Sequence, residues 1–530
     1  MSDRLRSLWL ALWTVVLLVP EMAFGQPLTV QDGIPLPSIA TSLPQNGDPA
    51  GLRKWLGDHG VVYNLIYTND TLSNISGGLK RGTINQGKLE TIVMVDFGKL
   101  AGWDGLQLYA NSFQIHNTGR IRRDYVGGVN TIAAIEAVPT SRLSELWLEQ
   151  KFLNGAVGFR FGQLAADSEF FFADASALFL NSDWATITAL NLPSGGAAYP
   201  QATPGVRLKV SPNSYASFLV AVLNGDPSGP GPGDDELRNK YGLNFRVTDP
   251  AFVIGEAQFR RNQGNDDTGL ASTYKIGAWG HLGAFNDKRF ANDGSLLADP
   301  NGSGVAASRR GNSGVYAAFD QQIYRPPGAG PTKGITVFGR VSGSPSDRNL
   351  ISFYTDGGIV FAGMIPHRPE DAFGATLLYA RYSDSVRSFD RDNVLLNGAL
   401  GPLRDYEMNL ELTYQAQIVP GWTVQPTAQW IWHPSGSLAN APPPRVSISR
   451  SNAHRTHWRC AAFARNKPGL AAGLCSWQRV PLTARCAGSR ARCRLPGRWR
   501  PSRSPTSAGR TCRRCWRNSS ERSASGRRRC

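Results

Sequence analysis

The chain has 530 residues, of which 57 are glycine, 10% are aromatic and 18% are charged. This composition argues against a protein built mainly of helices and favours many strands punctuated by glycine. The formal net charge of +17 would suggest a nucleic-acid or acidic-membrane partner, but 20 of the 57 Lys and Arg residues lie in residues 451–530, which hold a single acid, Glu521. Subtracting these from the totals leaves 37 basic and 39 acidic residues in residues 1–450, so the main body is nearly neutral and no nucleic-acid partner is expected.

The N-terminus has the pattern of a secretory signal peptide. Arg4 and Arg6 precede an apolar stretch over residues 8–19, and the small residues Ala23 and Gly25 suit a cleavage site. The alternative is a membrane anchor, but this stretch is shorter than the roughly 20 residues that a spanning helix needs. Residues 1–25 are therefore predicted to be a signal peptide that is cleaved during export.

Residues 26–57 are predicted to form a periplasmic N-terminal segment. They are rich in Pro, Ser and Gly and end in a short amphipathic helix in which Leu52, Trp55 and Leu56 share one face. No later segment of the chain approaches 18 consecutive apolar residues, so no transmembrane helix is predicted.

The barrel is predicted over residues 58–434, because from Val61 to about Trp432 the hydrophobic pattern has a period of two. In the clearest segment, Glu407 to Ile418, every second residue is apolar and every residue between them is polar. Successive side chains of a strand point to opposite faces, so such a segment lies between an oily phase and a wet one. Tight turns such as Pro420-Gly421 alternate with long connections such as residues 163–204, which is typical of outer-membrane barrels.

We therefore predict an all-β fold, a transmembrane antiparallel β-barrel of about sixteen strands with short periplasmic turns and long extracellular loops. A soluble β-sandwich or propeller also alternates, but its polar faces would not concentrate Arg, Lys, Glu and Gln in this way. The sequence has no repeat with the period of a propeller blade.

Several stretches resemble the carbohydrate-selective porin family typified by the glucose-inducible porin of pseudomonads, usually called OprB. The resemblance covers about residues 50–434 in order. Among the stretches that carry it are RLSELWLEQKF (residues 142–152), GFRFGQLAADSEF (158–170) and ELTYQAQIVPGWTVQPTAQWIWHP (411–434).

The resemblance implies passive diffusion of small carbohydrates, such as monosaccharides, through the outer membrane of a Gram-negative bacterium into the periplasm. It implies no cofactor and no energy coupling. The expected partners are small sugars, outer-membrane lipid and lipopolysaccharide, and a homo-oligomer stays open. The alternatives are a general or anion-leaning diffusion porin and, outside the class, a secreted β-rich carbohydrate-binding protein.

Eight residues are candidates for the pore lining, because a sugar offers hydroxyls for hydrogen bonds and a C–H face for aromatic rings. Seven carry a charge in phase with the polar side of a predicted strand, and the eighth is a tryptophan in the long loop. The alternative for each charge is a solvated side chain without a role in selectivity. The candidates are Glu149, Arg160, Trp184, Arg207, Lys209, Arg246, Glu256 and Arg340.

The loop over residues 163–204 is predicted to fold inward and form the constriction, as in similar porins. It is dense in aromatic residues, although the run Phe170–Phe172 suits an anchor to the inner wall equally well. Four acidic residues of this loop could be mistaken for paired catalytic carboxylates, but sequence spacing cannot establish their separation: Asp167, Glu169, Asp174 and Asp183. No enzymatic activity is expected.

Four rings are assigned to aromatic girdles at the membrane surfaces: Tyr67, Trp422, Trp430 and Trp432.

Residues 435–530 are predicted to be an aberrant basic tail that is disordered. The alternation ends after Pro434, and all seven cysteines of the chain lie beyond residue 459. Related porins continue with one last strand, which is expected to be missing here. A frameshift in GC-rich DNA would produce a sequence of this kind, rich in Arg and poor in acidic residues. A genuine basic arm that binds phosphates is the alternative. Cys512 and Cys515 have the spacing of metal ligands but no suitable partners, so no zinc site is expected.

Overall fold

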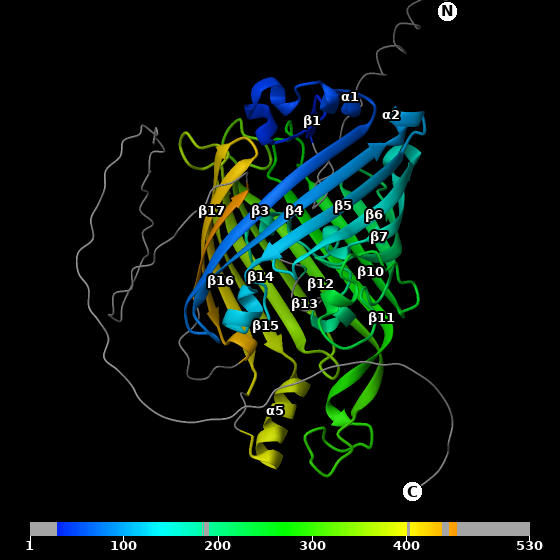
Figure 1. Ribbon diagram of the computed structural model, residues 1–530, viewed down its shortest axis with the longest axis vertical. Helices are drawn as coiled ribbons and strands as arrows, with labels where there is room; N and C mark the ends of the chain where they lie inside the picture. Colours follow the sequence, from blue (N-terminus) through cyan, green and yellow to red (C-terminus); the bar gives the residue numbers. More distant parts are fainter. Residues whose placement is uncertain (1–28, 183, 185–189, 400–402, 437–444, 453–530) are drawn as a thin grey trace, which may run out of the picture. The chain divides into compact units, whose positions relative to one another are not determined.

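A computed structural model describes residues 29–182, 184, 190–399, 403–436 and, for their backbone, 445–452. The predicted signal peptide and the cysteines of the tail lie outside the described residues. Within these ranges, sixteen antiparallel strands form a closed barrel (Figure 1). The strands are β3 (Val61–Ser76), β4 (Gly82–Asp96), β5 (Leu106–Asn117), β6 (Thr140–Phe152), β7 (Val157–Leu164), β8 (Thr203–Val210), β9 (Ala216–Asn224), β10 (Ala251–Arg261), β11 (Ser272–Ala291), β12 (Ala306–Tyr324), β13 (Gly334–Gly343), β14 (Ile351–Ala362), β15 (Ala372–Tyr382), β16 (Tyr406–Val419), β17 (Trp422–Trp432) and β18 (Arg445–Asn452).

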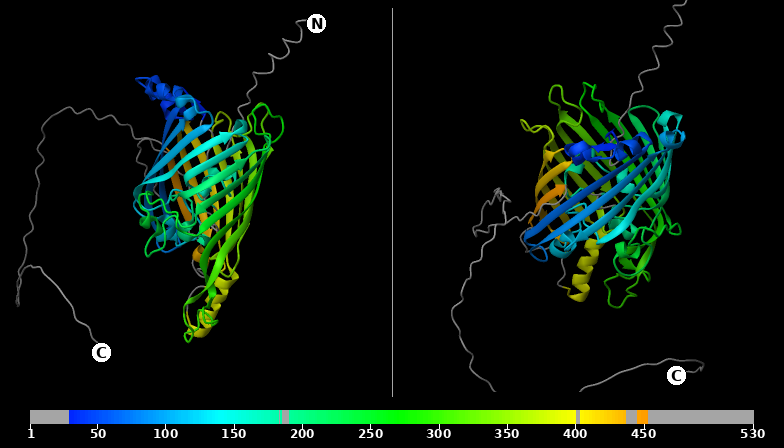
Figure 2. Two further views of the ribbon diagram at one scale, coloured as in Figure 1. Left: turned by 90° about the vertical axis from the view of Figure 1, so that its right-hand side faces the viewer. Right: turned by 45° about the horizontal axis from the view of Figure 1, so that its top comes forward.

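The wall of the barrel follows from the period of two. On β16 the polar residues Asn409 and Glu411 are fully buried on the inside, whereas Leu412 between Glu411 and Thr413 is 45% exposed on the outside. The outer faces of β7, β8 and β9 carry exposed Phe, Val and Leu side chains in the same way. The strands run at a slant around the tube, as Figure 2 shows. The predicted barrel, wet inside and apolar outside, is confirmed.

The N-terminal segment lies against one rim of the barrel. A hairpin of β1 (Thr29–Gln31) and β2 (Ile34–Leu36) precedes α1 (Leu52–Asp58), the predicted amphipathic helix. Arg53 of α1 donates a hydrogen bond to the Tyr63 hydroxyl at the start of β3, with an Nε to Oη distance of 2.9 Å. The β16–β17 turn touches this segment where Gly421, in a left-handed conformation (φ +74°), leaves no room for a side chain beside Ile39.

The two rims differ in the length of their connections. The rim with the N-terminal segment carries short links, such as residues 153–156 between β6 and β7, and the helix α2 (Phe97–Ala101). The opposite rim carries the long connections, including the helix α4 (Asp235–Arg238). The helix α5 (Asp384–Asn397), labelled in Figure 1, lies at the same rim. No helix in the described part of the chain is long and apolar enough to cross a membrane.

Two expectations about strands are corrected. A final strand was expected to be missing after Pro434, but β18 follows at Arg445–Asn452 and pairs with both β17 and β3, which closes the barrel. Pairing of backbone groups, rather than strict alternation of side chains, defines this strand. Arg246 was placed on a strand, but β9 ends at Asn224 and β10 begins at Ala251, so Arg246 lies in the connection between them. The origin of residues 453–530, which lie outside the described residues, stays a prediction.

Candidate functional site

The connection between β7 and β8 lies inside the barrel. Its backbone and side chains contact residues on the inner faces of β10, β11, β12, β16 and β17. Its aromatic residues Phe170, Phe171 and Phe172 are at most 4% exposed. Phe171 stacks on Tyr316 of β12 with 4.2 Å between the ring centroids. The predicted inward fold of this loop is confirmed, and its Phe run serves as the anchor to the inner wall.

Carboxylates on the inner wall hold this loop by accepting hydrogen bonds from its backbone amides. Because an ionised acceptor makes a stronger bond than a neutral one, each carboxylate is an effective clamp. The donor–acceptor distances are 2.8 Å from Phe171 N to Glu256, 2.8 Å from Asp174 N and from Ala175 N to Asp320, and 2.8 Å and 2.9 Å from Leu180 N and Asn181 N to Glu411.

Lys275 of β11 is a further clamp from the same wall. Its side chain has no exposed surface, and its Nζ donates to the Phe172 carbonyl at 3.0 Å and to the Asp174 carboxylate at 3.1 Å. The ammonium also lies 3.5 Å from the centroid of the Phe172 ring, a cation–π contact. Together with the carboxylate clamps, this lysine fixes the loop across the lumen.

A second long connection, residues 118–139, reaches the same interior. The Glu407 carboxylate of β16 accepts the backbone amide of Asn130 at 2.7 Å, and Gln429 of β17 donates to the Ile132 carbonyl at 2.7 Å. The two inward connections meet where Ala134 N donates to Leu180 O at 2.8 Å. They therefore narrow the lumen as one unit.

We call the connection between β7 and β8 the constriction loop. Beside it, four charged residues form a network that we call the charged quartet: Glu149, Arg160, Glu169 and Arg207. Arg207 donates from Nη1 to Glu149 at 2.8 Å and, through Nε and Nη2, to both oxygens of Glu169 at 2.9 Å and 2.6 Å. Arg160 donates to Glu149 at 2.8 Å and lies 3.3 Å from Glu169. Two cations and two anions thus neutralise each other on the wall formed by β6, β7 and β8.

The environment of the quartet keeps Glu169, a loop residue, ionised. Burial alone would raise the pKa of its carboxyl, but the guanidiniums of Arg160 and Arg207 and the hydrogen bonds from Arg207 outweigh burial and lower the pKa to about 2. An aromatic ring supports the network from the wall, since Arg160 lies 3.6 Å from the centroid of the Trp147 ring.

The depressed pKa of Glu169 has a consequence for stability. Because the folded pKa lies below the unfolded value of about 4.3, this carboxylate stabilises the barrel fully above that value and loses the contribution as the pH falls through about 2. We expect the difference in thermal unfolding temperature between wild type and Glu169→Gln to stay constant from about pH 7 to about pH 5 and to shrink below it. A difference that vanished near pH 6 would contradict the pairing.

The matching family model is "Carbohydrate-selective porin, OprB family", over residues 80–474. The chain belongs to the carbohydrate-selective porin family. This OprB-family porin is 25% identical over 417 residues to Porin B of Pseudomonas aeruginosa, which covers 74% of this chain and 87% of that protein. The family membership makes the chain an outer-membrane sugar porin of a Gram-negative bacterium and answers the alternative of a secreted binding protein.

One solved structure supports the fold of the porin. The high-pH structure of Pseudomonas putida OprB superposes with a TM-score of 0.67 at 20% identity and covers 77% of this chain and 97% of that one. The low-pH structure of the same protein gives a TM-score of 0.45 at 16% identity, covering 77% and 96%.

The porin brings five of its eight predicted lining residues into the lumen network. Arg160, Arg207 and Glu149 belong to the quartet. Glu256 holds the loop, and Arg340 pairs with Asp356 through Nε at 3.0 Å and 3.1 Å. Lys209 lies two residues after Arg207 on the same face of β8 and is half-buried. Most of these charged side chains are paired with an opposite charge or hydrogen-bonded to the loop.

Two predicted lining residues do not line the passage. Trp184 is only 3% exposed, because its ring packs edge-on against Phe252 and its indole donates to the Phe170 carbonyl at 3.0 Å. It is part of the interior of the folded loop, so no ring face is free for a sugar. Arg246 pairs with Asp249 at 2.7 Å in the β9–β10 connection and so lies outside the quartet.

Sequence reasoning missed the clamping role of the inner-wall charges. Glu411, Asp320 and Lys275 are each in phase with the polar face of a strand, which is the same signal that selected the eight candidates. Their partners are backbone groups of a loop far away in the chain, and no residue pattern marks those groups. Among the described residues no cluster of His, Cys, Asp and Glu is arranged to hold a metal ion.

Proposed function

We propose that small uncharged sugars, such as monosaccharides, pass by diffusion along the charged quartet and that the constriction loop sets the size limit. The observation that carries this proposal is the quartet itself, in which two guanidiniums and two carboxylates are paired at 2.6–3.3 Å. A paired set offers donors and acceptors to sugar hydroxyls while its net field on an ion is small. No energy coupling, cofactor or chemical reaction is part of the proposal.

A specific observation favours a second candidate, an anion-leaning pore. Lys209 lies two residues after Arg207 on the same face of β8, and its charge helps to lower the pKa of Glu169, so it adds a third cation beside the two cations and two carboxylates of the quartet. The excess charge of one cation would favour anionic solutes to a modest degree.

Liposome swelling separates the two candidates. Proteoliposomes with the full-length porin are expected to swell fastest in glucose, more slowly in a disaccharide and more slowly in gluconate, which matches glucose in size but carries a negative charge. Gluconate entry at or above the glucose rate would support the anion-leaning pore and contradict the neutral quartet. Heat-unfolded protein supplies the baseline.

We also propose that the apolar outer wall contacts outer-membrane lipid, including lipopolysaccharide, and we leave a homo-oligomer as an alternative arrangement. The exposed Phe, Val and Leu side chains on the outer faces of β7 to β9 support contact with acyl chains. Cross-linking of the porin in native membranes, followed by electrophoresis without heating, measures the number of subunits.

A further inference from the structure

A hollow of about 340 Å³ lies on the outer face of the barrel over β11, β12 and β13, and we call it the outer groove. Its lining residues are Ala278, Trp279, Ser313, Gly314, Val315, Gly343, Ser344 and Pro345. Ala278, Ser313 and Val315 are exposed on the outer face, whereas Trp279 and Gly314 are buried. Ala278 and Gly343 both pair with Val315 across the sheet, so these positions share one face. The groove exists because small side chains, and none at Gly343, occupy a stretch of wall where neighbouring positions carry large ones.

The flanks of the outer groove are apolar. Ile276, Leu282 and Val315 are 62%, 65% and 65% exposed on the outside of the barrel. In an outer-membrane porin this face meets lipid, so the groove suits an acyl chain rather than a soluble ligand.

A row of aromatic rings fixes the level of the groove in the membrane. Four rings follow one another in space on the outer face, with 6.5, 5.3 and 4.3 Å between successive ring centroids: Phe353, Tyr379, Tyr406 and His433. Tyrosine rings, such as the two in this row, are enriched at the level of the lipid headgroups. Phe353 pairs directly with Gly343, so the groove lies at the headgroup boundary near the rim with the long loops.

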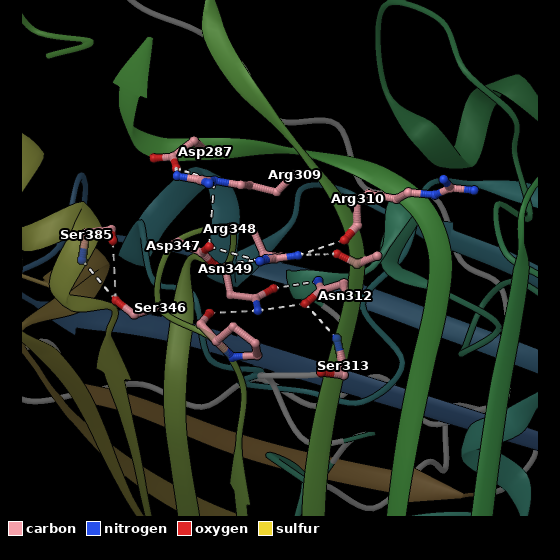
Figure 3. A network of polar contacts seen from close by, with 12 residues as sticks. Asp287, Arg309, Arg310, Asn312, Ser313, Ser346, Asp347, Arg348, Asn349 and Ser385 are labelled. Atoms are coloured by element: carbon pink, nitrogen blue, oxygen red, sulfur yellow. Dashed lines mark hydrogen bonds and ion pairs between the residues drawn. The ribbon is translucent and has the colours of Figure 1, made fainter. Parts of the chain in front are cut away.

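An arginine stands just beyond the groove toward that rim. Gly311 has a φ of +74°, a conformation that favours glycine, and it interrupts the alternation of β12. Arg309 therefore turns to Asp287, with Nε 2.7 Å from the carboxylate, while Arg310 points to the other side (Figure 3). Arg310 is exposed, and within the described ranges its guanidinium has no hydrogen-bond or ion-pair partner.

The backbone that carries Arg310 is held in place from the neighbouring loop. Arg348 donates to the carbonyls of Arg310 and Gly311 at 3.0 Å and 2.7 Å, and the side-chain amides of Asn312 and Asn349 exchange hydrogen bonds at 2.7 Å and 2.9 Å (Figure 3). The backbone at Arg310 is thus held in place, while its side chain is exposed.

The network beside Arg310 is balanced in charge without Arg310. Arg309 and Arg348 pair with the carboxylates of Asp287 and Asp347. Arg310 therefore adds one positive charge to the described residues of this region. An unpaired guanidinium above an apolar groove is complementary to a phosphate that is joined to acyl chains.

We propose that the outer groove and Arg310 bind a phosphorylated glycolipid of the outer leaflet, the lipid A part of lipopolysaccharide. One acyl chain lies in the groove and a phosphate accepts hydrogen bonds from the Arg310 guanidinium. The inference rests on the proposed lipid contact of the outer wall and is independent of the proposed sugar passage.

The test measures binding of bisphosphorylated lipid A to the full-length porin in detergent by native mass spectrometry. Arg310→Gln removes the cation, and Gly343→Leu fills the groove. The leucine fits because the nearest atom to a Cβ at position 343 is the Ser352 carbonyl at 3.8 Å. Each variant is expected to lower the affinity by about tenfold.

Matched controls come from elsewhere on the outer face. Arg261→Gln changes an exposed arginine at the opposite rim, and Gly255→Leu fills an outward glycine on β10 where the nearest atom is 3.6 Å away. Both are expected to bind like wild type. Unchanged binding by Arg310→Gln, or equal loss in the controls, would overturn the proposal. So would equal binding of phosphatidylglycerol, which would assign the site to phospholipid. Glucose swelling of the same variants shows separately whether the channel works.

Discussion

Replacing Asp320 and Glu411 together by alanine is expected to release the constriction loop from the wall. Each carboxylate accepts two backbone amides of the loop, and its removal leaves those amides without a partner in the lumen. A lost charge-assisted hydrogen bond costs about 1.5–3 kcal/mol, so the exchange of the Leu180 and Asn181 amides should speed up by roughly 10- to 100-fold. The measurement is hydrogen exchange of the porin in detergent, read by mass spectrometry.

The same double variant should also change transport. Its single-channel conductance is expected to rise, and a trisaccharide that wild type excludes should enter liposomes. Glu370→Ala is the matched control, because Glu370 is a half-exposed carboxylate that pairs with Lys333 outside the lumen. A double variant with wild-type exchange and wild-type size limit would show that other contacts hold the loop and would contradict the clamp.

Neutralising one member of the quartet is expected to make the pore select by charge. Glu169→Gln leaves Arg160 and Arg207 with only Glu149 as a carboxylate partner. One uncompensated charge about 6 Å from a solute in a wet channel is worth about 1 kcal/mol, so the ratio of gluconate to glucose entry should rise about fivefold. Liposome swelling measures that ratio, and the reversal potential in a chloride gradient should shift toward anions.

Removing a positive charge instead of a negative one tests the sign of this change in the ratio of gluconate to glucose entry. Arg160→Gln should lower the same ratio, and the combination of Glu169→Gln with Arg160→Gln should return it near wild type because the charges balance again. A difference in electrophoretic mobility between the heated and the unheated sample of each variant shows that its barrel is folded. If both single variants moved selectivity in the same direction, the change would come from pore size, and the electrostatic account would fail.

The wall of this porin was predictable from its residues. The alternation in segments such as Glu407–Ile418 identifies which side chains face lipid and which face water, because strand geometry places neighbours on opposite faces wherever the strand pairs. The same argument correctly put Arg160, Arg207 and Glu149 on the inside of the barrel. It could not say which of them pair, since that depends on the register between β6, β7 and β8.

Where the pattern failed, the cause was local. Arg246 follows an alternating stretch, but the backbone there pairs with no neighbouring strand, and an ion pair with Asp249 takes its charge. Trp184 was chosen for its ring, yet the inward loop buries that ring against Phe252. The last strand, β18, was missed because its place in the wall comes from pairing with β3 at the far end of the chain.

Alternating polarity along the chain was therefore enough to define a barrel, its inside and its outside, because solvent and lipid act on each strand separately. The constriction was different. Glu411 and Leu180 are 231 positions apart in the sequence. Arg207 and Glu169 come into contact only when the loop folds back onto β8. Contacts of this kind form between surfaces that exist only after the sheet has closed, so folding alone assigns the charges to clamp, quartet or lipid-facing rim.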